Sequence, residues 1–326
     1  MSAPPHSHAW LVGSAVAFAA GALFFPLAGP APLDYGAVLA RREPEWSILL
    51  QLRVSRTLLG LFAGGALALA GSLFQAMLRE ALATPYTLGV STGASLGAVI
   101  VIAVGGHTFL GVPAIWAGAL AGAAAVLFLV VGSAARHGRM SAFGLLLTGI
   151  ATNSVCSAAI LLIHGFAGMA QSFSIARWLL GSVDAIGYGA LVPFGVLVAL
   201  ITAWVLRQAR HWNLLAVGED WAAARGARVS RLMLGGYVAG SMLAASTVAL
   251  TGPIGFVGLI VPHLARSHVG ADHRVLIPCS FLMGGVLLAG CDALGRCILA
   301  PAEVPAGAIM ALVGGPYLVW LVRQRG

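Results

Sequence analysis

One stretch of the chain matches an enzyme motif. Gly89-Val90-Ser91-Thr92-Gly93 fits the G-x-S-x-G nucleophile elbow. That elbow places its serine on a sharp turn between a strand and a helix, with a histidine and a carboxylate to complete a triad. Here the pattern opens a long apolar run, and no histidine or aspartate is positioned nearby in the sequence. We therefore interpret Ser91 as a helix-packing residue and keep an intramembrane serine enzyme as the weaker alternative.

Histidine and cysteine are common metal ligands, but their spacing here is not typical of a metal site. The nine histidines form no cluster at helical spacing. The four cysteines lie inside apolar runs and are interpreted as small packing residues: Cys156, Cys279, Cys291 and Cys297. His164 and Met169 lie near the end of one apolar run, where the histidine is either an interfacial residue or a ligand of haem iron. No resident cofactor or metal is expected.

The composition predicts an all-α integral membrane protein. The chain has 326 residues, of which 60% are hydrophobic and 9% charged. A soluble domain carries about 25% charged residues, so this chain lacks the charge to cover a water-exposed surface. Spans need about 20 apolar residues each, and ten apolar runs are present with short polar connectors, near 9–28, 57–78, 88–106, 112–134, 142–165, 190–208, 231–251, 254–269, 276–296 and 305–322.

We expect these ten runs to form a single transmembrane domain over residues 1–326. The first run is a span or a signal peptide. A span is favoured because its leader has no arginine or lysine and the run is long for a signal sequence.

All 18 basic residues are arginines, and they predict the orientation. Ten spans with a cytoplasmic N-terminus place twelve arginines on the cytoplasmic side and six on the outer side, which is the bias of the positive-inside rule. Both termini are then cytoplasmic. The net charge of +8 is attributed to these flanking arginines and not to nucleic-acid binding, because no dense basic stretch with interleaved aromatics is present.

Glycine spacing and two interruptions predict how the spans pack. Pairs four residues apart, such as Gly60 and Gly64, or Gly118 and Gly122, let helix backbones approach closely in lipid. Gly252-Pro253 and Pro262 are expected to break or kink a helix inside the apolar region 244–262. The amphipathic stretch 171–181 is too short to span. Broken helices at membrane depth favour a transport pathway.

The connector 213–231 between the sixth and seventh runs is predicted to contain a short helix. Glu219 and Asp220 suit the positive end of such a helix, and Gly226 suits its C-terminal stop. This helix could dock into a groove of a cytoplasmic partner, or the segment is an ordinary loop.

Several long segments resemble the FecCD type of permease, which imports iron chelates and vitamin B12. The resemblance is carried by RVSRTLLGLFAGGALALAGSLFQAMLREALATPYTLGVSTGASLGA (53–98), NLLAVGEDWAAARG (213–226), GPIGFVGLIVPHLAR (252–266), DHRVLIP (272–278) and EVPAGAIMALVGGPYLVWL (303–321). It covers almost the whole chain in the family's order.

The resemblance implies a type II ABC importer permease fold of about ten transmembrane helices in the bacterial inner membrane. It implies two copies of the chain, two ATP-binding cassette subunits, a periplasmic substrate-binding protein and a metal-chelate substrate. Because the chain has no G-x-x-x-x-G-K-[ST] loop, another chain must hydrolyse the ATP. An ATP-independent secondary transporter and a metal-ion ABC permease remain as alternatives.

The resemblance also implies roles for residues of this chain. Those for coupling to the ATPase are Gly218, Glu219, Ala222 and Gly226. Those for docking the binding protein through exposed ion pairs are Arg53, Arg56 and Arg296. A cytoplasmic gate would include Glu80, Leu82, Ser141, Ala142 and Phe143, with Arg79 as the available partner of Glu80. The substrate path is expected to pass Asn153, His164 and Met169.

Overall fold

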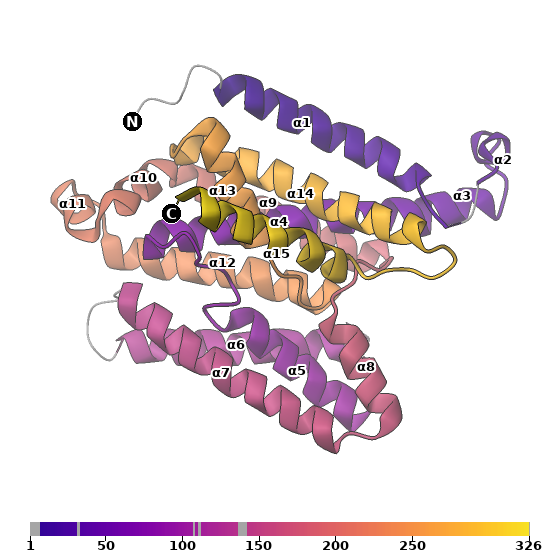
Figure 1. Cartoon of the computed structure of the whole chain (residues 1–326), viewed down its shortest axis with the longest axis horizontal. Coiled ribbons are helices and arrows are strands. Elements are labelled where there is room, and N and C mark those ends of the chain that lie inside the picture. The colour runs from indigo at the N-terminus through magenta and orange to yellow at the C-terminus, as the bar shows by residue number, and fades with distance from the viewer. Residues whose placement is uncertain (1–6, 31–32, 107, 110–111, 136–141, 326) are drawn as a thin grey trace.

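The computed structural model describes residues 7–30, 33–106, 108–109, 112–135 and 142–325. Over these residues the chain forms a bundle of long, nearly antiparallel helices (Figure 1). The long or apolar helices are α1 (Ser7–Phe24), α4 (Ser55–Leu78), α5 (Val90–Val104), α6 (Ala114–Ala135), α7 (Ala142–Phe166), α9 (Tyr188–Arg207), α12 (Val229–Thr251), α13 (Val257–Val269), α14 (His273–Ile298) and α15 (Ala306–Arg325).

Short elements connect the long helices. They are the 3-10 turn η1 (Phe25–Leu27), α2 (Tyr35–Leu39), α3 (Glu45–Ser47), the π-helical turn η2 (Ile48–Val54), the two-residue strands β1 (Thr108–Phe109) and β2 (Val112–Pro113), α8 (Met169–Leu179), α10 (Ala209–Val217) and α11 (Glu219–Ala224). The strands pair antiparallel.

The ten predicted apolar runs all correspond to helices. Within the described part of the chain, seven helices are long and apolar enough to cross a membrane, and α5 and α15 are shorter apolar helices. The run 254–269 contains the short helix α13. Its 13 residues extend about 20 Å, so α13, like α5, is shorter than a hydrocarbon core of about 30 Å.

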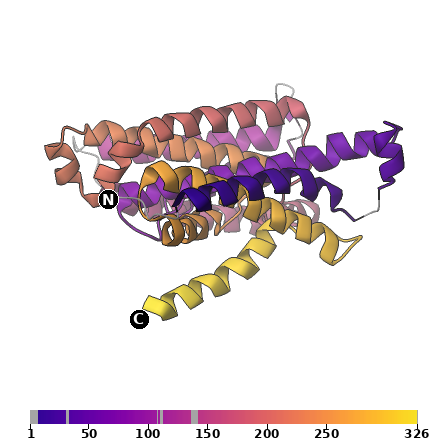
Figure 2. The ribbon, with the colours of Figure 1, turned by 90° about the horizontal axis from the view of Figure 1, so that it is seen from above.

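Helix α4 lies at the centre of the bundle. Nearly every one of its side chains is buried, and α12, α13 and α14 pack around it. A second layer of α5, α6 and α7 lies beside them (Figure 1). Seen from above, α15 leans away from the bundle (Figure 2).

Glycines set the closest helix contacts, as their spacing predicts. A Cβ on Gly97 would collide with the carbonyl oxygen of Gly118, and one on Gly122 would collide with that of Gly93. The same holds between Gly64 of α4 and the Gly284 carbonyl of α14. Small residues therefore let these backbones pack at a distance that side chains would prevent.

The predicted break is present at Gly252-Pro253, whereas the helix is not broken at Pro262. Helix α12 ends at Thr251, and α13 begins at Val257. Helix α13 continues through Pro262, so of the expected break or kink the break does not occur there. Proline leaves the carbonyl four residues earlier without its helical donor. The side-chain amide of Gln75 donates to that Gly258 carbonyl, with N and O 3.3 Å apart, and so compensates for the loss.

Candidate functional site

The predicted short helix in the connector 213–231 is α11, which follows α10 directly and carries Glu219 and Asp220 in its first turn. Ala222 is fully buried, and its carbonyl accepts the backbone N–H of Ala227 at 3.0 Å. Gly226 adopts a left-handed conformation, with φ of 82°, that suits the C-terminal stop of a helix. This turn fixes α11 at one end of the bundle (Figure 1).

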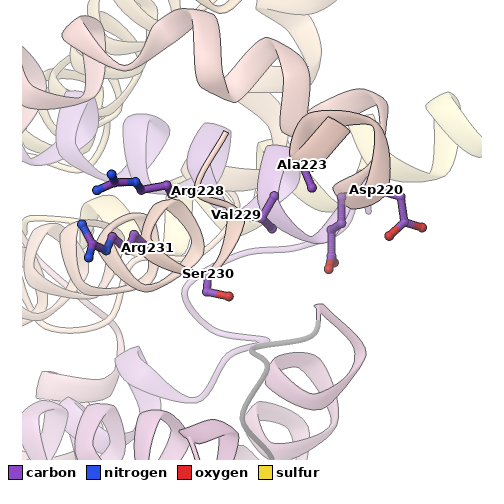
Figure 3. Close-up of a pocket in the computed structure, with 7 residues that line it drawn as sticks. Asp220, Ala223, Arg228, Val229, Ser230 and Arg231 are labelled. Atoms are coloured by element: carbon purple, nitrogen blue, oxygen red, sulfur yellow. The ribbon is translucent and has the colours of Figure 1, made fainter. Parts of the chain in front are cut away.

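A charged groove of about 430 Å³ runs between α11 and the start of α12 (Figure 3). Acidic and basic side chains both border it. Its lining residues are Glu219, Asp220, Ala223, Arg228, Val229, Ser230 and Arg231. Beside it the guanidinium of Arg225 stacks on the exposed Trp221 ring, 3.6 Å from the ring centroid. A surface of this kind can bind a polar protein partner.

The loop that follows α4 contacts α11 through an ion pair. Arg79 ends α4 in a left-handed conformation, and its guanidinium lies 3.9 Å from the carboxylate of Glu219. The expectation that Arg79 is the partner of Glu80 was therefore wrong. The Glu80 carboxylate instead accepts the backbone N–H of Leu82 at 3.3 Å. A movement of α11 can thus reach the loop that holds Glu80.

The residues expected to form a gate lie in two places. Glu80 and Leu82 border a cavity of about 250 Å³ with residues of α13 and α15, including Ile260, His263 and Tyr317. Ala142 and Phe143 begin α7, where the Phe143 side chain is 74% exposed. Ser141 lies outside the described residues.

A polar cluster joins α10 to the start of α14. The Asn213 amide donates to Asp272 at 2.8 Å, and its oxygen accepts the backbone N–H of His273 at 2.8 Å. Asp272 also caps α14 by accepting the N–H of Arg274. Burial acts to raise the pKa of Asp272, but these hydrogen bonds and the nearby charges of Arg274 and His273 lower it below its ordinary value. The cluster connects α10, and through it α11, to the bundle.

A buried ionic network occupies the opposite end of the bundle. Asp292 is 2% exposed and accepts three hydrogen bonds from Arg56, at 2.9 to 3.1 Å. It also lies 3.2 Å from the Nε atom of Arg296. Arg56 donates further to Glu303 at 2.8 Å. The network ties α4, α14 and the loop before α15 together.

The structure corrects the expected exposure of the docking arginines. Arg53 and Arg296 are buried because they donate to backbone carbonyls of the turn after α1: Arg53 to Leu27 at 3.2 Å, Arg296 to Ala28 at 2.9 Å. Arg56 is also largely covered, with 14% of its side chain accessible, and its guanidinium pairs with carboxylates of its own chain. Their role in docking stays a prediction.

The residues expected along the substrate path are spread over α7 and α8. Asn153 is half-buried and accepts a hydrogen bond from Thr92 of α5. His164 is half-buried near the end of α7, whereas Met169 begins α8 and is 91% exposed. The structure does not join these three into one site, and their role as a path is untested.

The structure also bears on the two kinds of chemistry considered from the sequence, a serine nucleophile and a metal site. Ser91 is fully buried inside α5, and its hydroxyl has no hydrogen-bond partner among the described residues. The residues directly before α5 form a turn and not a strand, so this segment lacks the strand-to-helix turn of a nucleophile elbow. In the part of the chain that the structure describes, no group of three histidine, cysteine or acidic side chains could hold a metal ion.

Sequence reasoning missed Asp292, Glu303 and Asn213. Asp292 carried a usable signal, because an acidic residue inside an apolar run needs a partner and Arg296 follows four residues later. Arg56 was not identifiable as its second partner, since the two residues lie 236 positions apart.

Comparison with known proteins places this chain among transport permeases. Residues 9–324 match the sequence model of the FecCD transport family. The ABC transporter permease YvrB of Bacillus subtilis, itself uncharacterised, is 40% identical over 301 residues, covering 89% of this chain and 83% of YvrB. The hemin transport permease HmuU of Yersinia pestis is 37% identical, covering 87% of this chain and 85% of HmuU.

A solved structure shares the fold. A transporter assigned to the metal-chelate ABC type, in an inward-facing conformation, superposes with a TM-score of 0.87 at 29% identity, covering 96% of this chain and 98% of the other. The match to the family spans nearly the whole chain, the helices fit a multi-pass membrane protein, and the short α11 lies at one end of the bundle. The chain belongs to the FecCD transport family and is a permease component of the metal-chelate and cobalamin type of ABC importer.

Proposed function

We propose that this permease forms the pore of an ATP-driven importer that carries an intact metal chelate across the bacterial inner membrane. The observation that carries the proposal is the position of α11. It lies at one end of the bundle, fixed by the Ala222–Ala227 turn and linked to α4 by the Arg79–Glu219 ion pair. A helix held in this way can transmit a push from an ATPase to the transmembrane helices.

The end that carries α11 faces the cytoplasm in this proposal. Helix α1 begins there, and α15 ends there (Figures 1 and 2). Arg225, Arg228 and Arg231 lie beside α11, which agrees with the positive-inside rule. Both termini are then cytoplasmic. The ionic network of Arg56 and Asp292 faces the outer side.

Two ATP-binding cassette subunits engage two copies of this chain, one at each α11. Gly218, Glu219, Ala222 and Gly226 shape the helix that they contact. Helix α15 supports pairing of two copies, because it leans away from the bundle and exposes large apolar side chains such as Leu312, Val319 and Trp320. At the outer end, a periplasmic binding protein docks near Arg56, the most accessible arginine of the three predicted.

The cargo is a chelate of the haem, ferric siderophore or cobalamin class. HmuU supports this class because its name assigns it hemin transport. Over the described residues, the lack of a metal-ligand cluster favours a chelate bound by shape over a free metal ion.

Copurification tests the proposed coupling. The chain is expressed with an ATP-binding cassette subunit sought among the genes beside its own, and ATPase retained on the purified permease is measured. We expect Ala222→Arg to abolish retention, since it places a charge at a buried helix position. Arg177→Gln, an exposed change in α8, should leave it unchanged. Retention by Ala222→Arg equal to that of the unaltered chain would contradict coupling through α11. No retention by the unaltered chain would favour a secondary transporter instead.

A further inference from the structure

A second cavity shares Arg228 and Arg231 with the charged groove of Figure 3. Its volume is about 390 Å³. It is lined by residues of α9, α10, α12 and the turn before α12: Trp204, Gln208, His211, Gly226, Arg228, Arg231 and Leu232. Figure 3 shows the guanidinium groups of Arg228 and Arg231 extending to the same side, away from Asp220.

Arg228 and Arg231 carry the positive charge that lines this cavity. Among the side chains that the structure describes, neither guanidinium has a salt-bridge or hydrogen-bond partner, although Glu219 and Asp220 border the neighbouring groove. No acidic side chain is among those that line the second cavity, whereas His211 adds a further nitrogen donor or acceptor. Two guanidinium groups on the same side of a cavity, without an ion pair among the described side chains, can bind a phosphate group.

Trp204 is held as one wall of this cavity. Its ring lies 6.1 Å from that of buried Trp212, in an edge-on arrangement. On the other side it lies against Gly235, where an added Cβ would come within 2.9 Å of the indole. A tryptophan fixed near the end of a membrane-spanning helix is typical of the membrane–water interface.

An apolar strip continues from the cavity along α9. Val196 and Leu200 precede Trp204 by eight and four residues, so the three share one helix face, and Val196 and Leu200 are 52% and 65% exposed. A free phosphate ion would use only the charged end of this surface. A phospholipid would use both, with its phosphate at the arginines and an acyl chain along α9.

We propose that this cavity, which we term the Trp204–Arg231 pocket, binds the phosphate of an anionic phospholipid headgroup. The pocket lies at the end of the bundle that carries α11, where basic groups between helices recognise anionic lipids. A lipid bound there contacts Gly226, the residue that ends the α11 turn, and so stabilises the position of α11. This proposal does not depend on the identity of the transported chelate.

The test measures lipid retention by the purified full-length permease without any partner subunit. The chain is equilibrated with phosphatidylglycerol in detergent, and bound lipid is counted by native mass spectrometry. Each arginine contributes about a fivefold increase in affinity, so Arg228→Gln with Arg231→Gln should weaken retention about thirtyfold. Arg207→Gln with Arg210→Gln removes the same charge from exposed positions outside the pocket and should change retention less than about twofold.

Two further arms distinguish the source of the phosphate and check the fold. Inorganic phosphate in excess should not displace the lipid; displacement by phosphate alone would overturn the lipid assignment. Equal loss of lipid in the two double variants would show general charge attraction and would also overturn it. Leu200→Ser lies outside the charged end and should weaken retention of the lipid while leaving phosphate affinity unchanged. Circular dichroism of each variant confirms that it is folded.

Discussion

Replacing Asp292 with alanine should destabilise the permease more than any change to the exposed part of the same network. Asp292 is 2% exposed and is the shared carboxylate of Arg56 and Arg296. Removing one member of a buried ion pair costs about 3–5 kcal/mol, because the remaining charge is left uncompensated. Arg56 keeps Glu303 as a partner, and Arg296 keeps the Ala28 carbonyl. We therefore expect the low end, about 3 kcal/mol.

Glu303 provides the matched control. It pairs with the same arginine, but its side chain is 40% exposed, so Glu303→Ala should cost about 0–1 kcal/mol. Both variants are purified in mild detergent and unfolded by a rising fraction of SDS, with helicity followed by circular dichroism. A cost of about 3 kcal/mol corresponds to a shift of more than a hundredfold in the ratio of folded to unfolded protein.

Equal costs for the two variants would refute the argument that burial makes Asp292 the central carboxylate. So would a variant lacking Asp292 that unfolds at the same SDS fraction as the unaltered chain.

Three further changes test other contacts by the same unfolding assay. Gly97→Ala should cost about 1–3 kcal/mol, because the added Cβ would overlap the Gly118 carbonyl. The control is Gly132→Ala, where the added Cβ meets open space. A cost for Gly97→Ala below that of the control would contradict the close helix contact. Gln75→Leu should cost about 1–3 kcal/mol by leaving the Gly258 carbonyl unpaired. Adding Pro262→Ala supplies a backbone N–H for that carbonyl and should restore part of the lost stability. A failure to restore it would contradict the pairing. The pKa of Asp272 is lowered in the folded chain, so its ionised carboxylate stabilises the fold above pH 3.8, and this stabilisation is lost as pH falls below that value. In Asp272→Asn the Tm should therefore depend less on pH in this range. An unchanged pH dependence would contradict this assignment.

The helices were predictable from the sequence because lipid imposes a strong pattern on them. Every long apolar run became a helix, and glycines at spacing four mark the contacts at Gly97 and Gly64. The short helix α11 was predictable from Glu219, Asp220 and Gly226 because the signals for helix start and stop are local.

Contacts between distant positions were not predictable in the same way. The sequence does not show that Gln75 satisfies the carbonyl freed by Pro262, so a break or a kink was expected there. It does not show that Arg79 pairs with Glu219. The burial of Arg53 and Arg296 depends on the turn after α1, which lies far from both residues in the sequence. Such pairings require the packed structure.

The most direct test of the proposed function is uptake into proteoliposomes that contain the permease with its ATP-binding cassette subunit, with ATP enclosed on the ATPase side. A binding protein sought among the genes beside that of the permease is added on the opposite side, loaded with haem, a ferric siderophore or cobalamin. We predict ATP-dependent accumulation of one of these chelates and none of free ferric ion. Accumulation that follows an ion gradient without ATP, or that requires only the free metal ion, would contradict the account.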